Sequence, residues 1–268
     1  MVDFFYSDPH LGHSTILHGT KDQPFEREIR KVKFGWQNVK EMDEGIIDIF
    51  NSVVPKDATT THLGDMFFYG RRWSEEALAK MNGKHILICG NHDHLPHKMM
   101  KLGFAYACCH ATTMIAGHVV NLSHFQYADA MDDGNKYRHR ALKYEEKWLI
   151  HGHVHSRWKT RPEFRMINAS ADANDFRPLS RDYLTKYIQT EEHKIKAVQA
   201  CEEKKNNVFE QVTDLYIEDT KRHFLQNWFL KTCGLGMVVT PEDIKYQKLL
   251  AESEWNRRIG KLNGGNNG

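Results

Sequence analysis

ILICGNHDH, residues 86–94, joins an apolar, partly β-branched run to a cluster of polar side chains. The run reads as a buried strand, and Gly90 ends it. Asn91, His92 and Asp93 follow directly, so the strand carries an amide, an imidazole and a carboxylate at its carboxyl end. Because ligand sites of open α/β sheets form outside the carboxyl ends of strands, this stretch predicts a functional site on an α/β fold.

The rest of the first 180 residues repeats this pattern of a strand followed by polar side chains. Predicted strands cover residues 2–7, 58–63, 85–89, 112–116, 119–123, 148–151 and 165–169. Helices are expected from Met42 to Phe50 and from Ser74 to about Asn82, and Gly117-His118 is expected to form a hairpin turn. This order predicts an α/β fold in which helices flank two mixed β-sheets.

The side chains at these strand ends are typical metal ligands. They are Asp8, His10, Asp65, Asn91, His124, His153 and His155. Residues i and i+2 of an extended segment project to the same side, so Asp8 with His10 and His153 with His155 are each expected to form a local pair of ligands. This mixed nitrogen and oxygen set suits manganese, iron, zinc, cobalt or nickel. Seven side chains exceed the needs of one tetrahedral zinc and indicate two ions that share a carboxylate.

Composition limits the class of partner. The 268 residues are 40% hydrophobic and 27% charged, with a net charge of +2, which is typical of a globular protein and gives no overall basic character for nucleic acid. The beginning, MVDFFYSD, has neither a basic leader nor a long apolar run, and the five cysteines form no CxxC pair. We therefore expect a cytoplasmic protein that does not bind membranes.

The composition changes after Pro178-Leu179-Ser180. We predict a catalytic domain over residues 1–184, a helical appendage over 185–262 and a disordered tail over 263–268. The appendage is rich in Lys and Glu with an apolar stripe, and Thr240-Pro241 signals a second helix within it. Such a helix is expected to cover the catalytic domain or to pair two copies of the chain in a homo-oligomer.

Five separated motifs occur in the order typical of one family. They are SDPHLGH (7–13), HLGDM (62–66), CGNHDH (89–94), LSHF (122–125) and IHGHVH (150–155). Over about residues 2–180 the chain resembles the calcineurin-like metallophosphoesterases, and in particular the compact bacterial and phage-type members. The resemblance implies a four-layer α+β sandwich. Pro9 departs from the family pattern, which often has a small polar residue there.

The resemblance also implies a role for each ligand. One ion would be held by Asp8, His10 and His155 and the other by Asn91, His124 and His153, with Asp65 bridging them. The ions would be two divalent metals, with manganese the first choice. A metal-bridging hydroxide would attack phosphorus, and His92, oriented by Asp93, would protonate the leaving oxygen.

Several other residues receive weaker expectations. His13, Arg138 and Arg140 are candidate substrate-binding residues, and Tyr127, Tyr137 and Tyr144 in the same polar segment are candidates to stack a base; a solvated loop is the alternative for that segment. Asp172 is expected to form an Asx turn, Cys89 to pack in the core, and His62 and His85 to lie at the surface or in turns.

The predicted function is therefore hydrolysis of phosphomonoesters or phosphodiesters, with nucleotides or related small molecules as substrates. Two alternatives remain at this point. A nuclease would need a basic groove, for which residues 136–143 are the candidate. A binding scaffold on a phosphoesterase fold would be expected to have lost ligands, whereas this chain keeps all of them.

Overall fold

The computed structural model describes the backbone of residues 3–20 and 26–220 and the side chains of residues 3–20, 26–200, 202 and 203. The chain divides into two compact units, residues 1–197 and 198–268. The first unit contains both sheets and all the candidate ligands. Within the described residues, no helix combines the length and the apolar character needed to cross a membrane.

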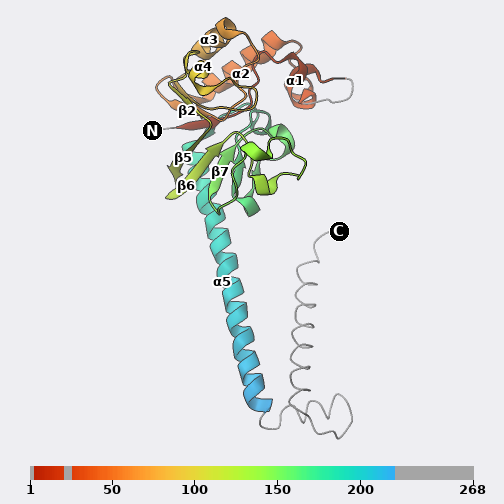
Figure 1. The fold of residues 1–268 in the computed structure, drawn as a ribbon, viewed down its shortest axis with the longest axis vertical. Helices are drawn as coiled ribbons and strands as arrows, with labels where there is room; N and C mark the ends of the chain where they lie inside the picture. Colours follow the sequence, from red (N-terminus) through yellow and green to blue (C-terminus); the bar gives the residue numbers. More distant parts are fainter. Residues whose placement is uncertain (1–2, 21–25, 221–268) are drawn as a thin grey trace. The chain divides into compact units, whose positions relative to one another are not determined.

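Two mixed sheets form the centre of the first unit (Figure 1). The first has the strand order β10-β1-β2-β3-β4 and comprises β1 (Phe4–Tyr6), β2 (Thr59–His62), β3 (Lys84–Ile88), β4 (Tyr106–Cys108) and β10 (Leu179–Ser180). Its strands run parallel except for β10. The second has the order β5-β6-β7-β9-β8 and comprises β5 (His110–Ile115), β6 (His118–Ser123), β7 (Trp148–His151), β8 (Thr160–Arg161) and β9 (Met166–Asn168). The prediction of two mixed sheets with helices is confirmed.

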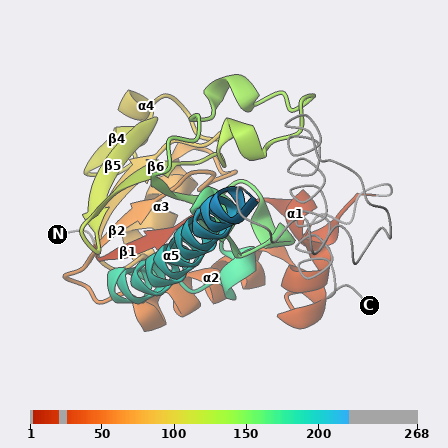
Figure 2. The ribbon, with the colours of Figure 1, turned by 90° about the horizontal axis from the view of Figure 1, so that it is seen from below.

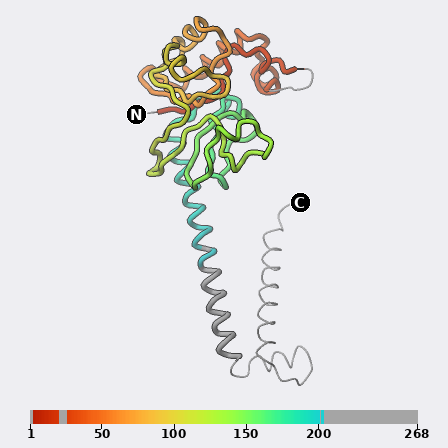
Figure 3. Tube along the Cα trace, viewed as in Figure 1, coloured from red at the N-terminus to blue at the C-terminus, as the bar shows by residue number. Residues whose placement is uncertain are grey.

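Helices accompany the first sheet. They are α1 (Ser14–His18), the π-helix η1 (Glu28–Lys33), α2 (Val39–Val53), α3 (Arg71–Lys80) and α4 (Pro96–Met100). The Cα trace in Figure 3 shows that the chain completes these helices before it enters the second sheet. Short 3-10 turns occur later in the chain: η2 (Ala128–Ala130), η3 (Arg138–Arg140), η4 (His155–Arg157), η5 (Pro162–Phe164) and η6 (Asp172–Asn174).

Three apolar clusters hold these layers together. Met42, Ile46 and Phe50 of α2 pack with Leu87 between the first sheet and its helices. The cluster between the two sheets joins Phe5, Leu63 and Ile88 of the first to a set from the second that includes Val120, Leu122, Trp148 and Ile150. A smaller cluster covers the second sheet elsewhere and contains Tyr127, Leu149 and Met166. The two sheets are therefore packed against each other through an apolar interior.

Two predicted boundaries were wrong for local reasons. The helix expected from Ser74 begins at Arg71, because Gly70 is its N-cap and the Ser74 hydroxyl donates back to the Gly70 carbonyl at 3.3 Å. The hairpin turn is Ala116-Gly117 rather than Gly117-His118, since His118 pairs with Ile115 in the ladder. Both turn residues have positive φ, 53° and 80°, as a two-residue type I′ turn requires.

The expectation that His62 and His85 lie at the surface was also wrong. Both are buried, and His62 Nε2 lies 3.0 Å from His85 Nδ1. His85 Nε2 must donate to the Met81 carbonyl, 3.3 Å away, so its Nδ1 accepts and His62 Nε2 donates. This tautomer leaves His62 Nδ1 as a buried acceptor without a partner. Cys89 is buried in the same core, as predicted.

Helix α5 (Arg181–Thr220) follows β10 in the chain. Figure 2 shows this helix from below. Its first turns belong to the first unit, because Leu184 and Ile188 are fully buried in the cluster between the sheets. Glu192, further along, accepts a hydrogen bond from Trp148 Nε1 at 2.7 Å. The predicted boundary at residue 184 thus lies inside a packed helix, and the domain assignment remains a prediction. The helix expected after Thr240 and the tail over 263–268 lie outside the described residues.

Candidate metal centre

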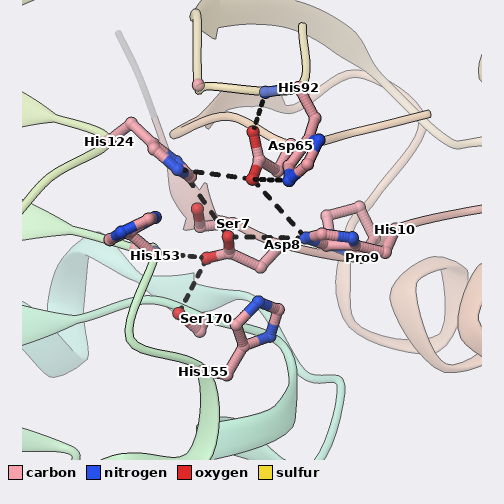
Figure 4. Close-up of polar contacts among 12 residues, drawn as sticks. Ser7, Asp8, Pro9, His10, Asp65, His92, His124, His153, His155 and Ser170 are labelled. Carbon is pink, nitrogen blue, oxygen red and sulfur yellow. Dashed lines mark hydrogen bonds and ion pairs between the residues drawn. The ribbon is translucent and has the colours of Figure 1, made fainter. Parts of the chain in front are cut away.

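The candidate ligands lie at the carboxyl ends of five strands, where the two sheets meet. Asp8, Asp65 and Asn91 follow β1, β2 and β3 of the first sheet. His124 follows β6, and His153 and His155 follow β7 of the second sheet. A parallel bridge between Ser7 and Ser170 joins the segments beside them. Figure 4 shows the side chains pointing toward one another, with the Asp65 carboxylate between His124 and His10.

Asp8, His10 and His155 form the first group of converging ligand atoms. Asp8 Oδ2 accepts hydrogen bonds from Ser170 Oγ at 2.7 Å and from the His153 backbone N–H at 2.9 Å. Asp8 Oδ1 and His10 Nε2 are buried, lie 3.9 Å apart and have no hydrogen-bond partner. Buried polar atoms are normally satisfied, and a divalent cation would satisfy these two together.

Asp65, His124 and His153 form the second group. The fully buried His124 directs Nδ1 at the Leu63 carbonyl, 2.8 Å away, so Nδ1 donates and Nε2 is the nitrogen directed at the other ligand atoms. That nitrogen lies 3.0 Å from Asn91 Oδ1 and 3.4 Å from Asp65 Oδ2. These three atoms converge, and once His124 has lost its Nε2 proton they form the donor set of a borderline divalent metal.

The two groups share one oxygen of Asp65. Asp65 Oδ1 accepts the His92 backbone N–H at 2.8 Å, which fixes the carboxylate. Asp65 Oδ2 then lies 3.6 Å from His10 Nε2 in the first group and 3.4 Å from His124 Nε2 in the second. This geometry is what a bridging carboxylate requires, and the residues present fit a pair of divalent cations.

The electrostatics of the second group also favour a positive charge. Burial lowers the pKa of His124, but the Asp65 carboxylate outweighs burial and raises that pKa to about 9. Burial raises the pKa of Asp65, yet His124 and His10 hold it well below its usual range. Asp65 is therefore ionised at neutral pH, and a proton or a metal compensates its charge at the His124 ring.

The backbone at the ligands corrects one step of the sequence argument. Five candidate ligands have left-handed backbone with φ between 49° and 70°, namely Asp8, His10, Asp65, His153 and His155. The segments are therefore not extended, and the i, i+2 argument was wrong. Asp8 and His10 do share a group, whereas His153 and His155 belong to different groups. Such conformations cost about 1–3 kcal/mol each and are found mainly at functional sites.

Contacts outside the ligand groups set the orientation of two imidazoles. His155 Nδ1 donates to Asp172 Oδ2 at 2.8 Å, and His10 Nδ1 lies 3.1 Å from His13 Nδ1. In each case Nδ1 makes the supporting contact and Nε2 remains free to bind a metal ion, as in metal sites whose histidines are oriented by hydrogen bonds. Asp172 is thus a buried partner of His155 and not the expected Asx turn. Arg30, its other partner, carried no signal in the sequence.

His92 lies on the open side of the two groups. Its side chain is 45% exposed, and Nε2 is 4.0 Å from Asp65 Oδ2. Asp93 was predicted to orient the His92 ring, but its hydrogen bonds go elsewhere. Its two carboxylate oxygens accept the backbone N–H groups of Asp65, Met66 and Gly90 at 2.8–3.1 Å. Asp93 therefore ties two ligand loops together rather than orienting the His92 ring.

The candidate substrate-binding residues lie in different surroundings. His13 stacks on Phe68, with ring centroids 3.8 Å apart, directly beside His10. Arg140 donates to the Gly90 carbonyl at 3.2 Å, which places its guanidinium next to Asn91. Arg138 instead pairs with Asp133 in its own loop at 3.0 Å.

Only one of the three tyrosines expected to stack a base is at the site. Tyr127 is fully buried and bonded to the Lys147 carbonyl, and Tyr144 packs against it. Tyr137 lies 5.1 Å from the His153 ring, edge to face, and stacks on Phe125. The polar segment after His124 therefore contributes Tyr137 and Arg140 to the rim.

Two glycines allow the ligand loops to approach. A Cβ on Gly90 would collide with Asp65 Oδ1, and one on Gly152 would collide with Ser7 Oγ and Asp8 Oδ2. The loops after β3 and β7 thus lie directly against the two carboxylates.

Comparisons with known proteins agree with this fold. A solved structure described as a protein of unknown function from Aquifex aeolicus aligns with a TM-score of 0.51 and 25% identity, covering 70% of this chain and all of that one. An uncharacterized protein of Methanocaldococcus jannaschii is 24% identical over 193 residues, 69% of this chain and 90% of its own length. No protein-family model matches the chain.

A phage protein has a higher sequence identity to this chain than these two proteins have. The Gene 66 protein of Mycobacterium phage L5 is 32% identical over 173 residues, which is 57% of this chain and 77% of that protein. With this identity and coverage, the chain belongs to the family of the phage L5 Gene 66 protein.

Proposed function

We propose that the protein is a phosphoester hydrolase that depends on two divalent metal ions, of the calcineurin-like metallophosphoesterase type. The observation that carries the proposal is the shared Asp65 oxygen, which faces one imidazole of each ligand group at 3.6 Å and 3.4 Å. The order of the five motifs and the two mixed sheets support the same assignment, including its four-layer sandwich.

Two cations held there, with manganese the proposed metal, would neutralise a phosphoester and make hydroxide available near neutral pH. Asp8, His10 and His155 would hold one of them, and Asn91, His124 and His153 the other. The residues around these ligands fix their free atoms in place before any substrate arrives, because one oxygen of each carboxylate is already tied to a backbone N–H.

His92 is the proposed general acid. Its exposed ring stands beside Asp65 without being needed as a ligand, so it can hold a proton toward the leaving oxygen of a bound ester. Arg140 and Tyr137 at the rim supply a cation and an aromatic ring, which suits nucleotides or related small phosphoesters as substrates.

Manganese-dependent hydrolysis of bis-p-nitrophenyl phosphate tests the proposal. Asp65→Asn is expected to abolish the activity, because it removes the shared anion. His92→Ala should have a small effect on this ester, whose leaving group needs little protonation. The same variant should slow hydrolysis of a dialkyl phosphodiester, whose leaving alkoxide needs a proton, by about 10²-fold or more. His94→Ala, an exposed histidine in the same loop, is the matched control. Full activity of Asp65→Asn would refute the proposal.

A further inference from the structure

Arg30 is a fully buried arginine on η1 whose N–H groups all have acceptors. Nε donates to Asp172 Oδ1 at 2.7 Å, and Nη2 donates to Asp172 Oδ2 at 2.9 Å. Nη2 also reaches the Asp8 carbonyl at 3.0 Å, while Nη1 reaches the Pro9 carbonyl at 2.8 Å and Met42 Sδ at 3.5 Å. A buried charge with this many directed contacts fixes the groups around it.

These contacts lead to every member of one ligand group. Arg30 holds the carbonyls of Asp8 and of Pro9, the residue before His10. Through Asp172 it also holds His155, because Asp172 Oδ2 accepts the His155 Nδ1 hydrogen at 2.8 Å. One guanidinium therefore sets the positions of Asp8, His10 and His155 together.

The second ligand group is supported differently. His124 is fixed by the Leu63 carbonyl, and Asp65 by the His92 backbone N–H. Among the described side chains, no hydrogen bond joins Arg30 or Asp172 to Asn91, His124 or His153. The direct contacts of Arg30 and Asp172 therefore reach the first group alone, and the links between the groups are the shared Asp65 and the His153 backbone N–H that donates to Asp8 Oδ2.

We propose that Arg30 and Asp172 form a positioning pair that controls binding of one cation, the one held by Asp8, His10 and His155, and leaves the other unaffected. This inference rests on the proposed dinuclear centre. Arg30 also engages both Asp172 oxygens, so that this carboxylate orients His155 instead of competing with Asp8 as a ligand. Lysine cannot replace it, because an ammonium lacks the planar fork that reaches a carboxylate and two carbonyls at once.

Manganese titration of the metal-free full-length protein, by calorimetry and by electron paramagnetic resonance, tests this. The wild-type protein should bind two ions and give the signal of a coupled pair. Arg30→Lys and Asp172→Asn should each retain one site at wild-type affinity, weaken the other about 10- to 100-fold, and give the spectrum of an isolated ion. Asn91→Ala should show the opposite pattern, with the first site retained.

Two further variants control for folding. Lys33→Met removes another ion pair of η1, the exposed one between Lys33 and Asp175, and should change neither affinity. The double variant Arg30→Met/Asp172→Leu removes both charges, so that neither is left buried and unpaired, and should show the same selective loss as Arg30→Lys. The retained second site reports that each variant is folded.

The outcomes separate the inference from the proposed function. If the wild-type protein binds two ions and the Arg30 and Asp172 variants bind both unchanged, or lose both equally, the inference is overturned while the dinuclear centre stands. If the wild-type protein binds no manganese, both are overturned. Loss of one site with retention of the other in all three variants supports the inference.

Discussion

At the scale of single residues, five of the candidate ligands have one side-chain atom in contact with a supporting group and one directed inward, namely Asp8, His10, Asp65, His124 and His155. Asp8 Oδ2 and Asp65 Oδ1 accept backbone N–H groups, which leaves the other oxygen of each free for a cation. The residue types were readable from the sequence because each follows a strand. Which atom is free was not readable, since it depends on contacts with segments far away in the chain, such as Ser170 with Asp8.

His124 gives a prediction for metal binding against pH. Its pKa in the metal-free protein is raised to about 9, burial lowering it and Asp65 raising it more, so the ring carries a proton at neutral pH. A ligand nitrogen must lose that proton. Apparent manganese affinity at the second group should therefore rise about tenfold per pH unit as pH increases from about 7 to 8.5.

Calorimetry in buffers of different ionisation enthalpy measures this as about one proton released per ion. His124→Asn has no titratable group at this position. Manganese binding to this variant, however weak, should therefore release no proton from the second group. Binding to the wild-type protein that is independent of pH over this range would contradict the assignment of His124 as a protonated ligand.

At the scale of elements, the loops after the strands had to approach more closely than most side chains allow. Gly152 follows β7 and lies against Ser7 and Asp8. Gly152→Ala should push Asp8 from its hydrogen bonds, weaken binding of the first cation and destabilise the fold by about 1–3 kcal/mol. Urea denaturation and manganese titration measure the two effects.

Gly134→Ala is the control, because a Cβ there meets no atom within 4 Å. If Gly152→Ala binds both ions as the wild-type protein does, the close approach is not required for the centre.

The longer strands and helix α2 were predictable because apolar residues recur at their periods. The strands β4, β8 and β10, each of two or three residues, were missed. The π-helix η1 was missed as well, and with it Arg30, because its sequence, EIRKVK, has no apolar face of helical spacing that marks it.

At the scale of the whole molecule, the buried His62–His85 pair makes stability depend on pH. Burial, followed by repulsion from His85, lowers the pKa of His62 well below its usual value, and burial also lowers that of His85. The unfolded chain therefore binds more protons than the folded protein below about pH 6.5, the ordinary pKa of histidine. The free energy of unfolding should therefore have its full value, as far as these two histidines are concerned, above that pH. It should decrease as the pH drops below it.

Urea denaturation of the metal-free protein between about pH 5 and 7.5 measures this loss. Buried histidines near the candidate centre contribute in both directions, since burial lowers the pKa of His151 to about 4, whereas Asp65 outweighs burial and raises that of His124 to about 9. The double variant His62→Gln/His85→Gln should therefore show a shallower dependence, not none. An unchanged slope in that variant would contradict the contribution of the pair. The pair could not be predicted from the sequence, because TTTH has the composition of an exposed strand, and its burial depends on strands that pair with it on both sides.

The left-handed backbone at five ligands limits how this centre can change in evolution or design. Asp, Asn and His tolerate that conformation, whereas β-branched and bulky side chains do not. Substitution at these positions is thus confined largely to hard oxygen donors and imidazole. The proposed centre would then accept one first-row divalent ion in place of another, whereas variants that recruit soft metals would have to remodel the loops before changing their side chains.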